Sequence, residues 1–147
     1  MPILSGQIVT ADDLNHLKPA TYHASASVSL VGVVTDADIV GATITFDTDT
    51  DNAVYVATGD FDADWDGAAT GLFQGKLAVD GGIQTELVLI SQAAGAAGDR
   101  IPGSHTWRGT LATAGTHTLK LIGTVPDVDQ AFESVHTALT LVIYEVV

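Results

Sequence analysis

Residues 60–66 read DFDADWD, a strict alternation of carboxylates and apolar side chains that Gly67 closes. In an extended strand, the four carboxylates line one face and the three apolar side chains line the other. In a loop, Asp62, Asp64 and Asp66 match the opening of a calcium-binding loop, with oxygen ligands at positions 1, 3 and 5. The first arrangement indicates a structural β domain with an acidic face, and the second indicates a metal-dependent binding module.

The calcium interpretation fails at one position of the loop. An EF-hand needs glutamate at position 12, which is Phe73 here, and it needs helices on both sides, whereas these flanks have strand patterns. A β-type site in which Asp62, Asp64 and Asp66 meet the acids of residues 47–51 across strands stays open. The sequence favours a strand whose carboxylates face solvent, with no cofactor required.

The aromatic side chains of this strand, Phe61 and Trp65, are then candidates for the core or for an oligomer interface. Trp107 alternates with Arg108 and shares a face with Leu111. Core burial and sugar stacking are the two roles open to the tryptophans. Tyr144 in the last apolar run is a further candidate for the core or for an oligomer interface.

Other catalytic patterns are missing from the sequence. The five histidines are scattered. Neighbouring strands could bring His105 and His117 together, but a surface or core role is favoured for them. The chain has no G-x-S-x-G elbow, phosphate loop or dinucleotide fingerprint. The sequence therefore predicts a protein that is not an enzyme.

The composition excludes several partners. Eighteen acids against five Lys and Arg give a formal charge of −13, which argues against nucleic acid and against anionic membrane surfaces. Apolar residues make up 46% of the chain, so it can bury a core. There is no cysteine, no signal-peptide pattern and no apolar stretch long enough to insert in a membrane.

Residues 1–20 differ from the rest of the chain. Thr10 starts a pattern typical of a capped helix, with Val9 and Leu14 as a hydrophobic staple and Pro19 as the stop. A helix this short is stable only when it packs against another surface. It either packs on its own β body or docks on a neighbouring protein through the apolar residues of this segment, namely Ile8, Val9, Leu14 and Leu17.

From Tyr22 onward the apolar residues recur with period two, which predicts β-strands. The predicted strands cover residues 24–30, 42–47, 53–59, 72–79, 83–91, 104–112, 117–124 and 137–147. Asp80-Gly81-Gly82 and Ala114-Gly115 each indicate a hairpin turn. The sequence thus predicts an all-β antiparallel sandwich, most simply a jelly roll of about eight strands over residues 21–147, after an N-terminal anchor segment of residues 1–20.

Two parts of the sequence resemble a known family. Residues 5–15, SGQIVTADDLN, resemble the start of phage minor virion proteins. The body resembles small head-fibre, decoration or minor tail proteins of actinobacterial phages and the C1q/TNF-type jelly roll. The stretches that carry this resemblance are NAVYVA at 52–57, KLAVDG at 76–81, WRGTL at 107–111, AGTHTLKL at 114–121 and VIYEV at 142–146.

The resemblance implies a homotrimeric virion protein on the surface of a capsid or tail, made in the host cytoplasm. It implies that residues 1–20 dock on capsid or tail proteins, and that aromatic residues lie near the threefold axis. The alternative is a minor tail or receptor-binding adhesin that recognises a host-surface glycan, with or without Ca²⁺ at the aspartates.

Overall fold

The computed structural model describes residues 19–65, 71–92 and 98–145, and these residues form β-strands joined by turns and loops. The strands are β1 (Ala20–Ser25), β2 (Leu30–Val31), β3 (Val34–Thr48), β4 (Ala53–Trp65), β5 (Gly71–Val79), β6 (Gly82–Gln92), β7 (Asp99–Leu111), β8 (Gly115–Val125), β9 (Ala131–Phe132) and β10 (Ala138–Tyr144).

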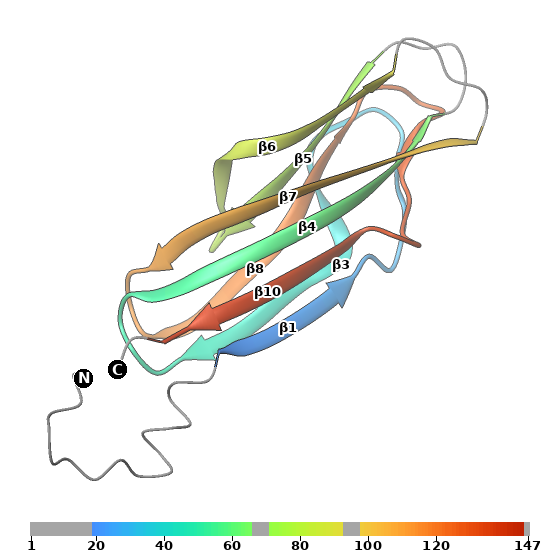
Figure 1. The fold of residues 1–147 in the computed structure, drawn as a ribbon. Coiled ribbons are helices and arrows are strands. Elements are labelled where there is room, and N and C mark those ends of the chain that lie inside the picture. The colour runs from blue at the N-terminus through green and yellow to red at the C-terminus, as the bar shows by residue number, and fades with distance from the viewer. Residues whose placement is uncertain (1–18, 66–70, 93–97, 146–147) are drawn as a thin grey trace, which may run out of the picture.

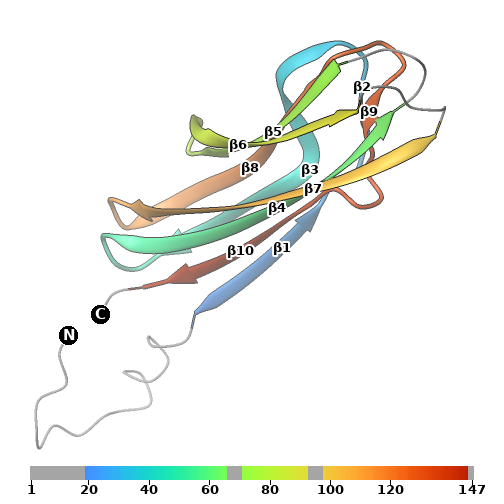
Figure 2. The ribbon, with the colours of Figure 1, turned by 45° about the horizontal axis from the view of Figure 1, so that its top comes forward.

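These strands form two antiparallel sheets that pack face to face (Figure 1). One sheet holds β1, β10, β4 and β7 side by side, and the short strands β9 and β2 extend it beyond the end of β10. The other sheet has the order β3, β8, β5, β6. Figure 2 shows both layers from a second direction. The prediction of an all-β antiparallel sandwich is confirmed.

The core lies between the sheets because alternate residues of each long strand point inward. β3 ends in a strict alternation, in which Ile44 and Phe46 are buried and Thr43 and Thr45 are exposed. Phe73 lies 5.2 Å from Trp65 and 5.1 Å from Phe132 between ring centroids. Each such aromatic side chain buries about 150–250 Å², so this cluster is a main source of hydrophobic stabilisation.

The structure confirms one predicted hairpin and corrects the other. Asp80 and Gly81 have φ of 49° and 84° between β5 and β6, as a primed hairpin turn requires. The turn at Ala114 instead joins β7 of one sheet to β8 of the other, so these two strands do not pair. His105 and His117 therefore lie in different sheets and do not meet across neighbouring strands, in line with the surface or core role that the sequence favours for them.

The predicted N-terminal helix and its residues Ile8, Val9, Leu14 and Leu17 lie outside the described residues. No described residue belongs to a helix that is long and apolar enough to cross a membrane.

Candidate functional site

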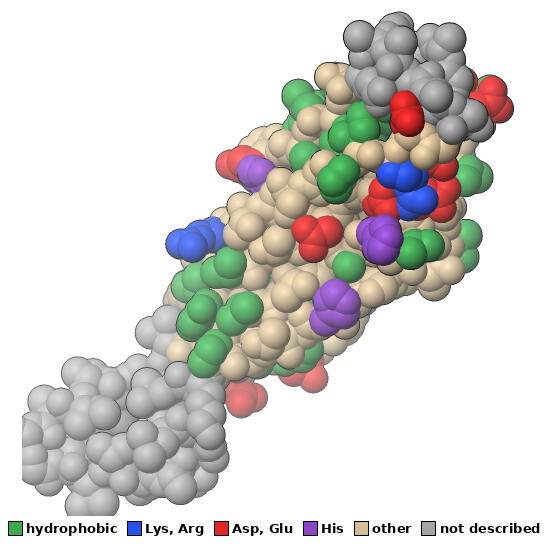
Figure 3. Space-filling model, turned by 45° about the vertical axis from the view of Figure 1, so that its right-hand side comes forward, with side chains coloured by type: hydrophobic (Ala, Val, Ile, Leu, Met, Phe, Trp, Pro, Cys, Tyr) green, Lys and Arg blue, Asp and Glu red, His purple; other side chains and the backbone are tan. Residues whose placement is uncertain are grey.

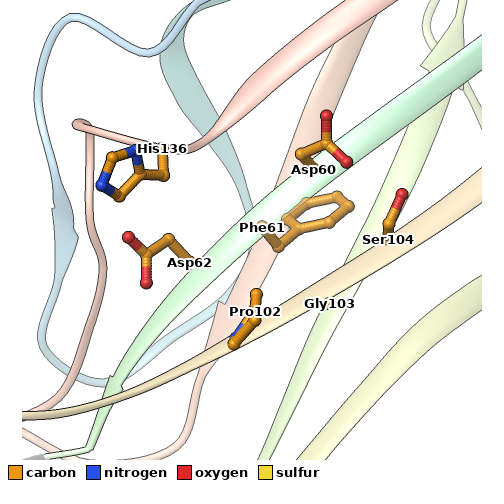
Figure 4. A pocket seen from close by; sticks show the side chains of 7 residues that line it. All are labelled: Asp60, Phe61, Asp62, Pro102, Gly103, Ser104 and His136. Carbon is orange, nitrogen blue, oxygen red and sulfur yellow. The ribbon is translucent and has the colours of Figure 1, made fainter.

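A groove lies on the open face of the sheet that contains β4 and β7. It consists of two adjoining hollows of about 320 and 290 Å³, which share Asp62, Pro102 and His136. Arg100 lines the first hollow. Asp60 and Ser104 line the second, which Figure 4 shows. Pockets for small molecules occupy about 300–1,000 Å³, so each hollow is at the small end of that range.

The groove exists because β4 changes partners along one edge. β10 pairs with β4 only as far as Asp60, and β9 pairs with it again from Ala63. In the gap, the amide of Asp62 donates to the Thr137 hydroxyl at 3.2 Å, and its carbonyl accepts from the Glu133 amide at 2.8 Å. The segment between β9 and β10 thus satisfies the backbone of β4 without forming a strand, and it forms one wall of the groove.

An ion pair between Asp62 and Arg100 lies in this groove. The Asp62 side chain is 6% exposed and that of Arg100 is 38% exposed. Arg100 Nε donates to Asp62 Oδ1 at 3.0 Å, and a terminal guanidinium nitrogen donates to Oδ2. The two residues are diagonal neighbours on one face of the β4–β7 pair, because Arg100 lies directly opposite Asp64. The bidentate geometry fixes both side chains.

The field around the guanidinium is acidic. The hydrogen bond to Asp62 raises the pKa of Arg100 against the opposing effect of burial, and the charges of Asp62, Glu133 and Asp64 raise it further. Arg100 is therefore a permanent cation, and the negative charges of the nearby carboxylates together exceed its single positive charge.

The remaining groups of the groove offer both hydrogen-bond donors and acceptors. Asp60, Ser104 and His136 are exposed at its rim, and Figure 4 shows Asp60 beside Ser104 and His136 beside Asp62. Pro102 adds an apolar ring. A proline fits here because β7 is an edge strand that pairs only with β4, so no sheet hydrogen bond is lost.

The acidic strand of residues 60–66 differs from its prediction at two described positions, because Asp62 is buried and Asp64 is half-buried. Phe61 and Trp65 are 1% and 0% exposed and pack in the core, and Asp60 faces solvent. Asp62 is buried instead of solvated, because Arg100 lies over it on the neighbouring strand. Asp66 lies outside the described residues.

The structure also separates the two acidic stretches that a β-type calcium site would join. Asp47 accepts from the Thr116 hydroxyl, and Asp51 accepts from the Ala114 amide at 2.7 Å, both beside the turn that precedes β4. Asp62 lies near the other end of β4, and a strand rises about 3.3 Å per residue, so the stretches cannot meet. Across the three described ranges, no three or more His, Asp and Glu side chains gather into a metal site.

Both tryptophans belong to the interior. Trp107 is 3% exposed, its indole nitrogen donates to the Glu86 carbonyl at 2.8 Å, and the His105 ring packs edge-on at 4.7 Å. Neither tryptophan is therefore available for sugar stacking. Tyr144, in contrast, is 47% exposed and does not belong to the core.

A second polar cluster joins two turns at the end of the sandwich where β1 begins. The Nδ1 of His117 lies 2.7 Å from Asp80 Oδ2, and its Nε2 lies 2.9 Å from the Thr113 carbonyl oxygen. Because both partners are acceptors, both contacts are hydrogen bonds when the ring is protonated on both nitrogens. The hydrogen bond to Asp80 raises the pKa of His117 against the effect of burial, and the Thr113 carbonyl adds to the rise. Sequence patterns gave no signal for this pair.

The same end of the molecule carries an apolar surface, which we call the terminal patch: Val54, Val56, Val142 and Tyr144. Tyr144 pairs with Val54 and Val142 pairs with Val56, so the four side chains share the outer face of the sheet. Figure 3 shows one cluster of hydrophobic side chains toward the lower-left end of the sandwich, and others toward the opposite end.

Comparisons with known proteins give structural likeness only. No family model and no curated protein matches the chain. The sandwich is similar to part of dimeric latent PorU from Porphyromonas gingivalis, with 8% identity and a TM-score of 0.48 over 85% of this chain and 12% of that chain. It is also similar to part of a chain in the structure of infectious bursal disease virus Gx strain, with 13% identity and a TM-score of 0.47 over 86% of this chain and 33% of that one. The chain thus spans a third or less of the length of these two chains, and at TM-scores below 0.5 neither likeness carries a functional argument.

Proposed function

We propose that this protein is a non-enzymatic structural component of a bacteriophage particle, a trimeric capsid-decoration or head-fibre protein that attaches through its N-terminal segment. The observation that carries the proposal is the nesting of its strand pairs. β5 pairs with β6, β4 with β7, β3 with β8 and β1 with β10, so that each pair encloses the previous one in the sequence.

Nested pairs of this kind are what a long antiparallel ribbon produces when it is rolled into two sheets, which is the jelly-roll arrangement. Double-sheet jelly rolls are common in viral capsid and lectin domains. The step from this fold to a virion role is fold-level analogy, so it needs support from the surface and a direct test.

The position of the chain ends supports attachment at one end of the sandwich. Ala20, the first residue of β1, pairs with Ile143 near the end of β10. Residues 1–18 therefore connect to the sandwich at the end that carries the terminal patch. An anchor joined there leaves the groove, which lies toward the other end of the sheet, facing away from the particle.

The terminal patch supports self-association. Three valine side chains and the exposed Tyr144 form a contiguous apolar area on a sheet face that no described element covers. Apolar areas of this kind mark interaction surfaces. We assign this area to the contact between copies in the trimer.

The chemistry of the described polar groups supports a role without catalysis. Asp62 is held by Arg100, and His117 is held between Asp80 and Thr113. The Asp62 carboxylate and the His117 ring are thus engaged by partners within the fold.

Binding of the chain to phage particles tests the proposal. Particles assembled without this protein are mixed with the full chain or with a chain that lacks residues 1–18, and pelleted through sucrose. We expect the full chain to pellet with the particles and the shortened chain to stay in the supernatant as a folded trimer. Equal pelleting of both chains, or of neither, contradicts the proposal.

A second function, a minor tail or receptor-binding adhesin for a host-surface glycan, is favoured by one observation. The groove presents Asp60, Ser104 and His136 to solvent on the end away from the terminal patch. The two functions are compatible in one protein, because a projecting fibre can be both structural and adhesive.

A further inference from the structure

We propose that the groove lined by Asp60, Asp62, Arg100, Pro102, Ser104 and His136 binds an uncharged sugar ring. This inference deepens the second candidate function, glycan recognition, by naming the ligand class and the groups that hold it, and it does not depend on the virion role.

The groove is a built feature of the fold. It requires β10 to leave β4 after Asp60 and β9 to replace it from Ala63, while Thr137 and Glu133 satisfy the backbone between these points. The Asp62 carboxylate at its floor is nearly completely buried and accepts two hydrogen bonds from Arg100. Placing a charge in such a position costs free energy unless it is paired, so the pair gives the groove a rigid polar floor.

The charges of the groove exclude two classes of ligand. Asp60, Asp62 and nearby Asp64 and Glu133 repel anions, and Arg100 alone does not outweigh them. A metal or organic cation has to compete with the Arg100 guanidinium, which already occupies both oxygens of Asp62. A ligand without net charge avoids both costs.

Uncharged sugars match the groups that remain. A sugar hydroxyl both donates and accepts, so it can donate to the Asp60 carboxylate and accept from His136, from Ser104 or from the free N–H groups of Arg100. The Pro102 ring supplies an apolar surface for the C–H face of the ring. With two adjoining hollows of about 320 and 290 Å³, the groove has room for neighbouring rings of one chain.

Further hydroxyl groups lie on the surface between the groove and the middle of the sheet. The Thr58 and Thr106 hydroxyls lie 2.9 Å apart, next along β4 and β7 from Asp60 and Ser104. Beside them, the Thr140 hydroxyl lies 3.1 Å from His23 Nδ1. A longer glycan can follow this hydroxyl-rich row, so oligosaccharides should bind more tightly than their single sugars.

Titration of the ¹⁵N-labelled full chain with sugars, followed by amide NMR shifts, tests the proposal. The probes are glucose, galactose, mannose and N-acetylglucosamine and their neutral trisaccharides, with glucuronate, glucosamine and CaCl₂ as charged comparisons. We expect at least one neutral sugar to shift the amides of residues 60–62, 102–104 and 136, with a dissociation constant on the order of millimolar. No shift with any neutral sugar, shifts confined to another surface, or tighter binding of a charged probe would overturn the proposal.

Variants of exposed residues assign the binding to the groove. Asp60→Ala and His136→Ala should each weaken binding at least about tenfold and leave the melting temperature nearly unchanged, because both side chains are exposed. Asp38→Ala is the matched control, since it removes an exposed acid from the other sheet, and it should bind like the wild type. Wild-type affinity in Asp60→Ala and His136→Ala together would contradict the assignment.

Discussion

At the scale of single residues, Arg100 determines the environment of Asp62, although the two residues lie far apart in the sequence. The alternation of residues 60–66 places Asp62 on the outer face, where an acid is normally solvated. Arg100, which lies opposite Asp64 on β7, covers it instead and leaves it 6% exposed.

Because Asp62 and Arg100 form an ion pair, we expect loss of Arg100 to destabilise the fold more than loss of an unpaired, exposed arginine. Arg100→Met leaves the buried Asp62 carboxylate without its partner and should lower the free energy of unfolding by about 1–3 kcal/mol, less than for a fully buried pair because Arg100 is partly exposed. Urea denaturation measures this loss. Arg108→Met, an exposed arginine on the same strand, is the control and should stay within about 0.5 kcal/mol of the wild type. Equal effects of the two variants would show that the Asp62–Arg100 pair contributes nothing.

The His117–Asp80 pair predicts a pH dependence of stability. The pKa of His117 is raised in the folded protein, so its stabilising effect is complete below about pH 6.5 and is lost as the pH rises through the raised value. Burial works to raise the pKa of Asp80, but the hydrogen bonds from His117 and the Thr118 amide lower it overall. The Asp80 contribution is therefore present above about pH 3.9 and is lost as the pH falls through the lowered value.

The variant His117→Leu isolates this effect. The wild type should exceed the variant in free energy of unfolding by about 1 kcal/mol near pH 5.5, a modest value because Asp80 is partly exposed, and this difference should shrink near pH 9. Guanidinium denaturation at the two pH values measures it. A difference that grows from the lower to the higher pH would contradict the raised pKa of His117.

At the scale of elements, substitutions at two glycines with positive φ distinguish the cost of backbone strain from the cost of a steric clash. Gly81 has φ of 84° in the β5–β6 turn with open space where a Cβ would lie, whereas Gly41 has φ of 91° and its Cβ would lie 2.5 Å from the Ser27 amide nitrogen. Gly81→Ala should cost about 1 kcal/mol through strain alone. Gly41→Ala should cost more, about 2–4 kcal/mol, because β3 must also move away from the segment that follows β1. Urea midpoints compare the two, and equal losses would show that the close approach of Ser27 is unimportant.

The elements also show what the sequence can and cannot predict. Period-two alternation predicts most strands, and Asp80-Gly81 predicts its hairpin because a primed turn needs positive φ. Ala114-Gly115 has similar turn chemistry, yet it crosses between sheets, since turn residues do not specify which strands pair. β7 begins at Asp99, earlier than its predicted start at 104, because an edge strand tolerates Pro102. The groove has no local signal, because Asp62, Arg100 and His136 meet only through the pairing of β4 with β7 and the gap between β9 and β10.

At the scale of the whole molecule, the terminal patch and the groove divide the open sheet face between two tasks. The terminal patch lies at the end where β1 begins, and the groove lies farther along β4 and β7 toward the other end. The proposed function assigns self-association and attachment to the terminal patch end and ligand binding to the groove.

The proposed trimer is tested by a substitution at the exposed Tyr144 side chain. Tyr144→Glu places a charge in the terminal patch and should convert the trimer to a folded monomer, because burying an unpaired carboxylate at an apolar contact is unfavourable. Native mass spectrometry measures the change. Val135→Glu, at a 70% exposed valine in the loop between β9 and β10, is the control and should remain trimeric. A wild-type monomer, or a trimer that survives Tyr144→Glu, would contradict the assignment of the patch.

The most direct test of the virion role is a cryo-electron microscopy map of particles that carry this protein, compared with particles assembled without it. The proposal predicts three sandwiches around a common axis on the particle surface, with the Ala20 and Tyr144 end toward the particle and the Arg100 end outward. Identical maps of the two particles, or sandwiches attached by the Arg100 end, would contradict it.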